Sequence, residues 1–351
     1  MRTLETKRLI LRPFTIEDFD AVHGYAANPH NTTYMLWGPN TEADTQHFIT
    51  FAMHNAEASP CRNYQYAAIL ESTGQLIGAC DLALSETHQN TGEIGWILHQ
   101  DYWGQGYATE MGHALIDFGF AQLDLHRIIA HCDAENVASA KLMERLGMRK
   151  EATYLDARPP NKTTTRPFSS EFMFAILKSD WEVAQEIAHY HSLPCEFGGF
   201  IDLPHLTNGN IQLICTKKTP ADPVKLWVPC YQFSICKGSE EIGGINLRIS
   251  YGGGAHNDNM YYGGNIGYGI QEAHRGKGYA VEACKLLIPV ARAHKMATLL
   301  ITNNEDNLAS RRVCEKLGAK HIRLAHLPPY NDLYKEGQRH SNIFEWRIDH
   351  V

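Results

Sequence analysis

Trp103-Gly104-Gln105-Gly106-Tyr107-Ala108 is the stretch that decides the fold, because it returns later in the chain as Arg275-Gly276-Lys277-Gly278-Tyr279-Ala280. The two copies lie 172 positions apart (275 minus 103). When residues 91–110 are aligned with 263–282, eight of the twenty columns are identical. Average composition would give about one or two. A repeat at domain length indicates two copies of one fold.

A second motif follows each glycine-rich stretch. Asn136-Val137-Ala138-Ser139 returns as Asn307-Leu308-Ala309-Ser310, and Leu-Gly follows both at the same interval. These copies lie 171 positions apart (307 minus 136), so one residue is lost between the motifs. The later elements that recur are a Pro-Pro step (159–160 and 328–329) and a closing apolar strand (171–177 and 343–348). The order of elements is therefore duplicated.

The repeat predicts three segments. We expect a domain over residues 1–178, a connecting helix and linker over 179–198, and a second domain over 199–351. Ser179-Asp-Trp-Glu182 has the form of a capping box, which starts a helix. Pro and Gly interrupt residues 192–199, as is typical of a boundary between domains.

Composition narrows the class of protein. The chain has 351 residues, of which 44% are hydrophobic and 20% charged, as in water-soluble globular proteins. It opens with no leader-like segment and has no run of about 18 apolar residues, so we expect a cytoplasmic protein without a membrane partner. Nine cysteines without a Cys-x-x-Cys pair indicate reduced thiols. The net charge of −7 argues against nucleic acid as a partner and for an amine substrate, although ordinary solubility explains it equally.

Hydrophobic periodicity predicts the elements of the first half. Strands are expected at 8–13, 65–70, 76–84, 92–98, 127–132, 148–154 and 171–177, and helices at 19–27, 42–55, 107–122 and from 136. In the third of these helices, Met111, Leu115 and Phe118 recur at helical spacing and predict its buried face.

The second half shows the same order with a shorter beginning. Strands are expected at 211–217, 231–236, 243–249, 265–270, 298–302 and 343–348, and helices at 279–294 and 307–317. No pair of helices is expected between residues 200 and 229. Pro289 falls inside a predicted helix and should kink it or mark its last turn, because proline lacks the N–H that bonds to the carbonyl four residues earlier.

A strand, a glycine loop and a helix in this order form an anion site. Glycine lets the backbone approach a ligand closely, and the N–H groups at the start of the helix have no partner within it. A phosphate or pyrophosphate is the expected ligand. A Walker loop is excluded because Gly-x-x-x-x-Gly-Lys is missing, and Thr109 and Val281 stand where a dinucleotide fingerprint has its third glycine. The alternative is that the glycines serve only to turn the chain.

The glycine motif, with Asn-x-x-Ser and Leu-Gly about thirty residues later, resembles the GNAT superfamily of acetyl-CoA-dependent N-acetyltransferases. Residues 3–178 are similar to the RimJ/RimL type, through Thr6–Phe14 and Tyr102–Glu110. The second half resembles the superfamily from 211 to 348, strongly in its CoA motifs. The resemblance implies an α/β (α+β) fold of two tandem domains. Each would have a mixed, twisted sheet splayed between its fourth and fifth strands and flanked by helices, with CoA in the gap.

The resemblance also implies the cofactor contacts, possibly with one acetyl-CoA in each domain. The implied cofactor-binding residues are Trp103, Gly104, Gln105, Gly106, Tyr107, Ala108 and Asn136, then Arg275, Gly276, Lys277, Gly278, Tyr279, Ala280 and Asn307. The backbones of the loops would hold the pyrophosphate, and the two asparagines would bond the pantetheine arm. From the residues alone, an asparagine at a helix start is more often an N-cap, and a serine three residues later usually solvates the first turn.

The resemblance places Ser139 and Ser310 near the thioester sulfur. The tyrosine that many members place seven positions after the asparagine, to protonate the leaving thiolate, is replaced by Met143 and Cys314. The two serines are therefore the candidate acids, and Glu93 is the third candidate catalytic residue.

Attack on a thioester requires a neutral amine and hence a base. Glu93 is the candidate base of the first half, where burial would raise its pKa, and the alternative is an ion-paired or structural carboxylate. Asn265 stands in the same column of the second half (265 minus 93 is 172) and cannot accept a proton. His274, His326 and His340 are nearby in sequence, although a lone histidine is usually structural.

Two functions stay open. The first is a tandem acetyltransferase whose acceptor is a protein N-terminus or a small-molecule amine, and the second is a CoA sensor or scaffold without turnover in one or both domains. Residues 158–166 and 328–338 are expected to select the substrate or to form solvated turns. No metal is expected, because zinc-ligand spacing is missing. The sequence leaves the oligomeric state open.

Overall fold

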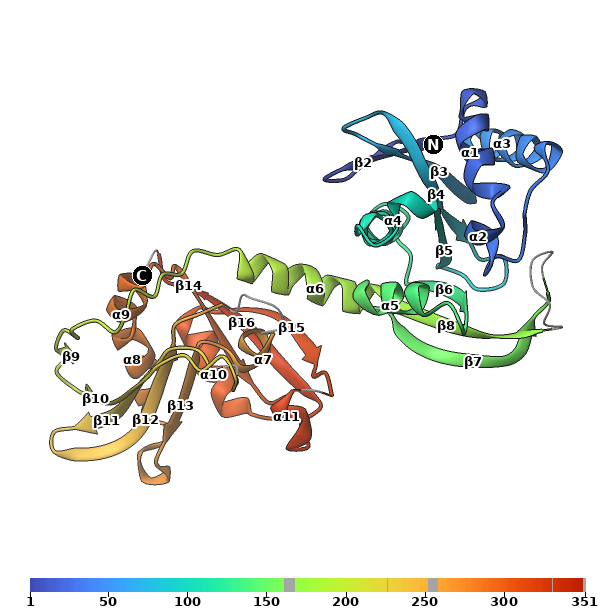
Figure 1. Cartoon of the computed structure of the whole chain (residues 1–351). Helices are drawn as coiled ribbons and strands as arrows, with labels where there is room; N and C mark the ends of the chain where they lie inside the picture. The colour runs from blue at the N-terminus through green and yellow to red at the C-terminus, as the bar shows by residue number, and fades with distance from the viewer. Residues whose placement is uncertain (161–167, 226, 252–257, 330, 350–351) are drawn as a thin grey trace. The chain divides into compact units, whose positions relative to one another are not determined.

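The computed structural model describes residues 1–160, 168–225, 227–251, 258–329 and 331–349 (Figure 1). Its internal contacts divide the chain into two compact units, Met1–Glu182 and Val183–Val351, which we call unit 1 and unit 2. The division falls inside helix α6 (Lys178–His191), which is the connecting helix expected from the capping box. The domain boundaries at 178 and 199 stay a proposal.

Unit 1 contains a mixed sheet of eight described strands in the order β1-β2-β3-β4-β5-β6-β8-β7. The strands are β1 (Leu4–Glu5), β2 (Leu9–Pro13), β3 (Asn63–Leu70), β4 (Gln75–Leu84), β5 (Thr91–Leu98), β6 (Arg127–Asp133), β7 (Arg149–Arg158) and β8 (Ser169–Leu177). The helices are η1 (Ile16–Asp18), α1 (Phe19–Ala26), α2 (Pro29–Thr32), α3 (Glu42–Glu57), η2 (Gln100–Tyr102), α4 (Tyr107–Ala121) and α5 (Val137–Arg145).

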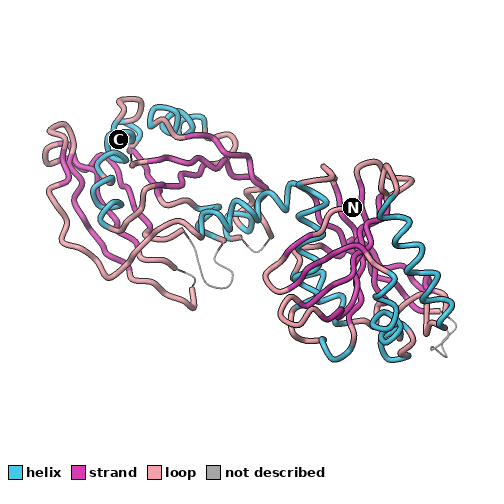
Figure 2. Tube along the Cα trace, turned by 90° about the horizontal axis from the view of Figure 1, so that it is seen from above, coloured by secondary structure: helices cyan, strands magenta, loops and turns pink. Residues whose placement is uncertain are grey.

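Two apolar clusters cover the two faces of this sheet. On one face, Met111 and Leu115 of α4 are fully buried against β4, β5 and β6, as the helical spacing predicts. On the other face, α1 and α3 bury Val22 and Ile49 against β3 and β4. The sheet is therefore a middle layer, and Figure 2 shows helices on either side of the strands.

The sheet of unit 1 opens between β5 and β6. These two strands are parallel and pair only at their first residues, from Thr91↔Arg127 to Glu93↔Ile129. Both strands then continue, β5 to Leu98 and β6 to Asp133, without further register pairs between them. In residues 94–97 of β5, the backbone groups that face away from β4 thus have no strand partner and are left for a ligand. This splay confirms the expected fold class.

Unit 2 repeats the arrangement with the order β15-β16-β14-β13-β12-β11-β10-β9. The strands are β9 (Leu206–Thr207), β10 (Gln212–Thr219), β11 (Cys230–Lys237), β12 (Glu240–Arg248), β13 (Ile266–Ile270), β14 (Thr298–Asn303), β15 (Lys320–His326) and β16 (His340–Arg347). The helices are α7 (Asn259–Gly263), η3 (Glu272–His274), α8 (Tyr279–Leu286), α9 (Ile288–Ala293), α10 (Leu308–Leu317) and α11 (Asp332–Lys335). The splay is wider here, because β13 and β14 share the single pair Ile266↔Ile301.

Proline breaks the first long helix of unit 2 as expected. Helix α8 ends at Leu286, and α9 begins at Ile288 with Pro289 in its first turn. The described part of residues 200–229 contains no helix, which also agrees with the prediction. The elements missed from the sequence are short or polar: β1, β9, α2, α7, α11 and the edge strand β15. None of the described helices is both long enough and apolar enough to cross a membrane.

Candidate active site

The two glycine loops have the same backbone. Gly104 and Gly106 adopt φ angles of 72° and 84°, and Gly276 and Gly278 adopt 78° and 87°. These values lie in the left-handed region, which side chains other than glycine rarely adopt. Gly106 and Gly278 are the N-cap residues of α4 and α8, so the first N–H groups of each helix face out of the loop. A Cβ at Gly104 or Gly276 would meet nothing within 4 Å. The positive φ angle, and not crowding, therefore selects glycine at these two positions.

The residue before each loop makes the same bond in both units. The indole Nε1 of Trp103 donates to the carbonyl of Leu98 at 2.9 Å, and Nε of Arg275 donates to the carbonyl of Ile270 at 3.0 Å. Leu98 and Ile270 are equivalent positions, again 172 apart. A tryptophan can therefore replace the family's arginine or glutamine because it supplies the same donor.

The next side chain of each loop is also matched. Gln105 donates from Nε2 to the carbonyl of Asp101, and Lys277 donates from Nζ to the carbonyl of Ala273, both at 3.0 Å. Each bond fastens the loop to the turn before it. The loops thus share their shape and differ in charge, since unit 2 carries two cations where unit 1 carries none.

Unit 1 brings a cation to its loop from the first hairpin. Arg8 pairs with Glu110 of α4 at 2.8 Å and donates to the carbonyl of Gln105 at 3.1 Å. In unit 2 the equivalent Glu282 accepts from the amides of Asn208 and Asn210 instead. The anchor between hairpin and helix is kept in both units, while the positive charge comes from Arg8 in one and from the loop itself in the other.

A groove of about 680 Å³ runs along the splay of unit 1. This volume suits a cofactor-sized ligand. Of the expected cofactor residues, those that line the groove are Trp103, Gly104, Gly106, Tyr107, Ala108 and Asn136, and Ser139 lines it too. Gln105 and Glu93 are not among its lining residues. The groove is also lined by His30, Asn31 and residues 33–35, by β6 and by Arg158.

The two asparagines are N-caps. Oδ1 of Asn136 accepts from the N–H of Ser139 at 3.1 Å, and Oδ1 of Asn307 accepts from the N–H of Ser310 at 3.0 Å. The N-cap interpretation is therefore confirmed for both. The serines differ in their hydroxyls, since Ser310 Oγ lies 2.9 Å from the phenol oxygen of Tyr268. Burial raises the pKa of Tyr268, which keeps this phenol protonated.

Glu93 is not buried, contrary to the expectation. Its side chain is 53% exposed and lies 3.0 Å from Nδ1 of His131 on β6. The reason is its place at the last pair of β5 and β6, where the sheet begins to open. The hydrogen bond with Glu93 raises the pKa of His131, which favours the charged form of the imidazole beside this carboxylate.

Asp81 is a half-buried carboxylate that sequence reasoning missed. It lies on β4 opposite Gly95 of β5. Burial, helped by the negative charge of Glu93, raises the pKa of Asp81 to about 6. The signal was an aspartate inside the otherwise apolar run Leu76–Leu84, which an ordinary strand would not place there.

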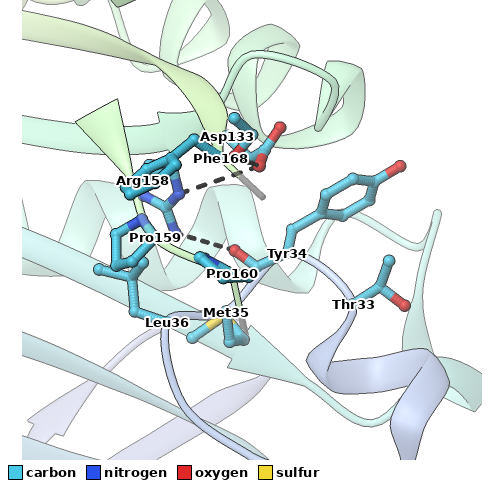
Figure 3. Close-up of a pocket in the computed structure, with 10 residues that line it drawn as sticks. Thr33, Tyr34, Met35, Leu36, Asp133, Arg158, Pro159, Pro160 and Phe168 are labelled. Atoms are coloured by element: carbon cyan, nitrogen blue, oxygen red, sulfur yellow. Dashed lines mark hydrogen bonds and ion pairs between the residues drawn. The ribbon is translucent and has the colours of Figure 1, made fainter. Parts of the chain in front are cut away.

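Arg158 joins three segments beside the groove (Figure 3). It bonds Glu171 of β8 at 2.6 Å and the carbonyl of Tyr34 at 2.9 Å, and its Nε lies 3.9 Å from Asp133 of β6. Ser169 donates to the same Asp133. Of the predicted selectivity loop 158–166, only residues 158–160 are described, since 161–167 lie outside the described residues. Residues 328–338 are described except for 330, and they include α11.

Asn265 has a structural role in unit 2, because its side chain bonds to the backbone of neighbouring strands. The side chain is fully buried, and its Nδ2 donates to the carbonyls of Arg248 and Ser250 at 3.2 and 2.6 Å. Its Oδ1 accepts from the N–H of Leu300 at 2.8 Å. Asn265 thus ties the end of β12 to β14 across the narrow end of the splay.

We expect Asn265→Asp to destabilise unit 2 at pH 8 by about 3 kcal/mol, because a carboxylate oxygen would then face two carbonyl oxygens without a proton between them. Hydrogen exchange of peptides from β12 and β14 measures the loss. The loss should shrink at low pH, where the carboxyl regains a proton. Equal protection from hydrogen exchange in the variant and the wild type would contradict this structural role of Asn265.

The candidate histidines of unit 2 have partners of their own. His274 lies 3.1 Å from Glu240, and His340 lies 3.2 Å from Glu305 and makes an edge-to-face contact with His326. The described residues contain no group of three or more His, Cys, Asp or Glu side chains able to hold a metal ion. All nine cysteines are free thiols.

Comparison with known proteins gives one consistent result. The sequence profile of the acetyltransferase (GNAT) domain matches residues 8–149 and 205–320. The chain is similar to the uncharacterized N-acetyltransferase YnaD of Bacillus subtilis, with 33% identity over 179 residues, 51% of this chain and 98% of YnaD. It is also similar to the spermidine N(1)-acetyltransferase of Escherichia coli K12, with 27% identity over 142 residues, 40% of this chain and 73% of that one. The solved structure of a GNAT-family acetyltransferase from Bacillus anthracis is 31% identical and covers 50% of this chain and 99% of its own, with a TM-score of 0.44.

Proposed function

Since the chain belongs to the GNAT acetyltransferase family, whose members use acetyl-CoA, we propose that unit 1 transfers an acetyl group to a primary amine by direct attack within a ternary complex. The observation that carries this proposal is the left-handed glycine loop at the edge of a 680 Å³ groove in the splayed sheet. The N–H groups of Gly104–Ala108 are available for the CoA pyrophosphate. The Nδ2 group of Asn136 would bond the pantetheine arm, and Ser139 would protonate the leaving thiolate.

The acceptor is proposed to be a small-molecule amine or a protein N-terminus. Asp133 lines the groove of unit 1 beside Arg158, and Glu93 lies at the mouth of the splay beside His131. One relative is named a spermidine N(1)-acetyltransferase, and one similar solved structure is described as a putative ribosomal-protein-serine acetyltransferase.

For unit 2 we propose a CoA site of the same kind, formed by Gly276–Ala280 and Asn307. A second candidate function, CoA binding without transfer, is favoured there by two observations. Asn265 is committed to backbone bonds in the column of Glu93, and the Ser310 hydroxyl is bonded to Tyr268. Ser310 is the candidate acid only if unit 2 also turns over.

Release of free CoA thiol from acetyl-CoA over a panel of amines tests the proposal. We expect amine-dependent release that Ser139→Ala slows on the order of 10²-fold, because loss of a proton donor costs about that much. Ser310→Ala is the matched variant in unit 2 and should leave the rate unchanged. No release with any amine, despite CoA binding, would leave only the binding function. Slowing by Ser310→Ala would show that unit 2 is a second enzyme.

A further inference from the structure

In unit 1 a glycine of β5 at the groove lies directly across from a carboxylate of β4. Gly95 of β5 lines the groove, and Asp81 of β4 is its register partner. A Cβ at position 95 would lie 2.7 Å from Oδ1 of Asp81. Any other residue at position 95 would therefore push the carboxylate aside.

Asp81 is surrounded by groups that do not neutralise it. Glu93 lies two residues from Gly95 on the same face of β5, and its own cation, His131, comes from β6. On β3 the register partner of Asp81 is Gln65, whose Oε1 accepts from Asn55 of α3. The neighbouring Cys80 thiol is buried on the other face of β4. No hydrogen bond or ion pair to the Asp81 carboxylate is found among the described residues.

The second copy of the fold acts as a control. Gly267 stands in the column of Gly95, and its register partner is Asn246, whose Oδ1 accepts from the N–H of Gly267 at 3.2 Å. At the positions of Asp81, Glu93, Asp133 and Glu171, unit 2 has Asn246, Asn265, Asn304 and Ser341. The carboxylates around the splay are thus replaced as a set by neutral groups, in the unit whose glycine loop keeps the same backbone shape.

We propose that Asp81 is the base that takes the proton of the acceptor ammonium, while Glu93, held by His131, binds that ammonium. This inference rests on the proposed function of unit 1. The ammonium gives one proton to the Asp81 carboxylate, and the freed lone pair forms the C–N bond to the thioester carbon. When the C–S bond breaks, the Ser139 hydroxyl gives its proton to the thiolate and takes the second proton of the nitrogen in its place. The products are the N-acetyl amine and CoA, and Asp81 releases its proton to water.

The environment suits this role. A base with a pKa near 6 is ionised at neutral pH and is a much better proton acceptor than an ordinary aspartate. Glu93, by contrast, is half exposed and already accepts from His131. Glu93, which the sequence predicts to be the base, therefore positions the amine instead.

The test is the pH profile of kcat and KM for the full chain with acetyl-CoA and the amine that gives the fastest thiol release. We expect Asp81→Asn to lower kcat 10²- to 10⁴-fold with unchanged CoA affinity. The wild type should lose activity below about pH 6, where Asp81 is protonated, and the variant should lack this acidic limb. Glu93→Gln should mainly raise KM and move that limb to lower pH, because a neighbouring negative charge is gone. Asp20→Asn, an exposed change on α1, is the matched control and should leave both parameters unchanged.

A second variant guards against loss of structure. Gly95→Ala keeps Asp81 but displaces its carboxylate, and we expect it also to lower kcat. At pH 8 the melting temperature of Asp81→Asn should not fall below that of the wild type, because the substitution removes a charge that has no cation beside it. Loss of a structural carboxylate would lower the melting temperature. An Asp81→Asn enzyme with kcat within threefold of the wild type and the limb intact would overturn this inference alone. A wild type that acetylates no amine would overturn the proposed function with it.

Discussion

Gly104→Ala is expected to weaken CoA binding to unit 1 by on the order of 10- to 100-fold, because the new methyl group would occupy the face on which the pyrophosphate is proposed to lie. Loss of one or two charge-assisted hydrogen bonds, at about 1.5–3 kcal/mol each, accounts for this range. Isothermal titration calorimetry with CoA measures it. If both units bind CoA, the titration should change from two tight sites to one.

Gly74 provides a matched control for backbone strain. It has a φ of 71° against 72° for Gly104, and a Cβ at either position would meet nothing within 4 Å. Gly74 lies in the turn between β3 and β4, so Gly74→Ala imposes the same strain of about 1–2 kcal/mol without touching the loop. Its CoA affinity should equal that of the wild type. Equal loss in both variants would mean that strain, not the ligand, requires glycine at 104.

Gly276→Ala is the mirror experiment in unit 2. The same reasoning predicts loss of the second site and retention of the first. If the wild type binds a single CoA, this variant decides which unit holds it. Retained stoichiometry in both single variants would contradict the assignment of the loops.

The features that the sequence predicted are local. A glycine at a helix start, an Asn-x-x-Ser cap and a helix broken near Pro289 each depend on residues within one or two turns, and all appear where expected. Repetition strengthened these predictions, because the same spacing occurred twice. The edge strand β15 was missed because its polar, irregular sequence shows no alternation.

The features that were missed depend on register between distant strands. Nothing near Asp81 in sequence indicates that a glycine lies across from it on β5, and the exposure of Glu93 follows from where two strands separate. Arg158 becomes informative only when β6, β7 and β8 are adjacent. The aspartate at position 81 was the one signal available, since a charged residue inside an apolar strand needs an explanation.

The second large effect is a loss of stability of unit 1 when Arg158 is substituted. We expect Arg158→Met to lower the free energy of unfolding of unit 1 by about 3–5 kcal/mol, because it leaves Glu171 and Asp133 without the cation that joins them. The arginine side chain is 10% exposed and the two carboxylates 18% and 8%, so water cannot replace it fully. The Tyr34 carbonyl would also lose its donor, which releases the segment 33–36 from the wall of the groove.

Hydrogen exchange of peptides from β6 and β8 measures this loss without assuming that the two units unfold together. Arg127→Met is the matched control, since it breaks a more exposed pair with Glu151 on the same sheet and should cost no more than about 1 kcal/mol. Adding Glu171→Gln to Arg158→Met should restore part of the protection, because one of the two uncompensated charges is removed. Similar losses for Arg158→Met and Arg127→Met would show that the Arg158 network adds no more stability than a surface ion pair.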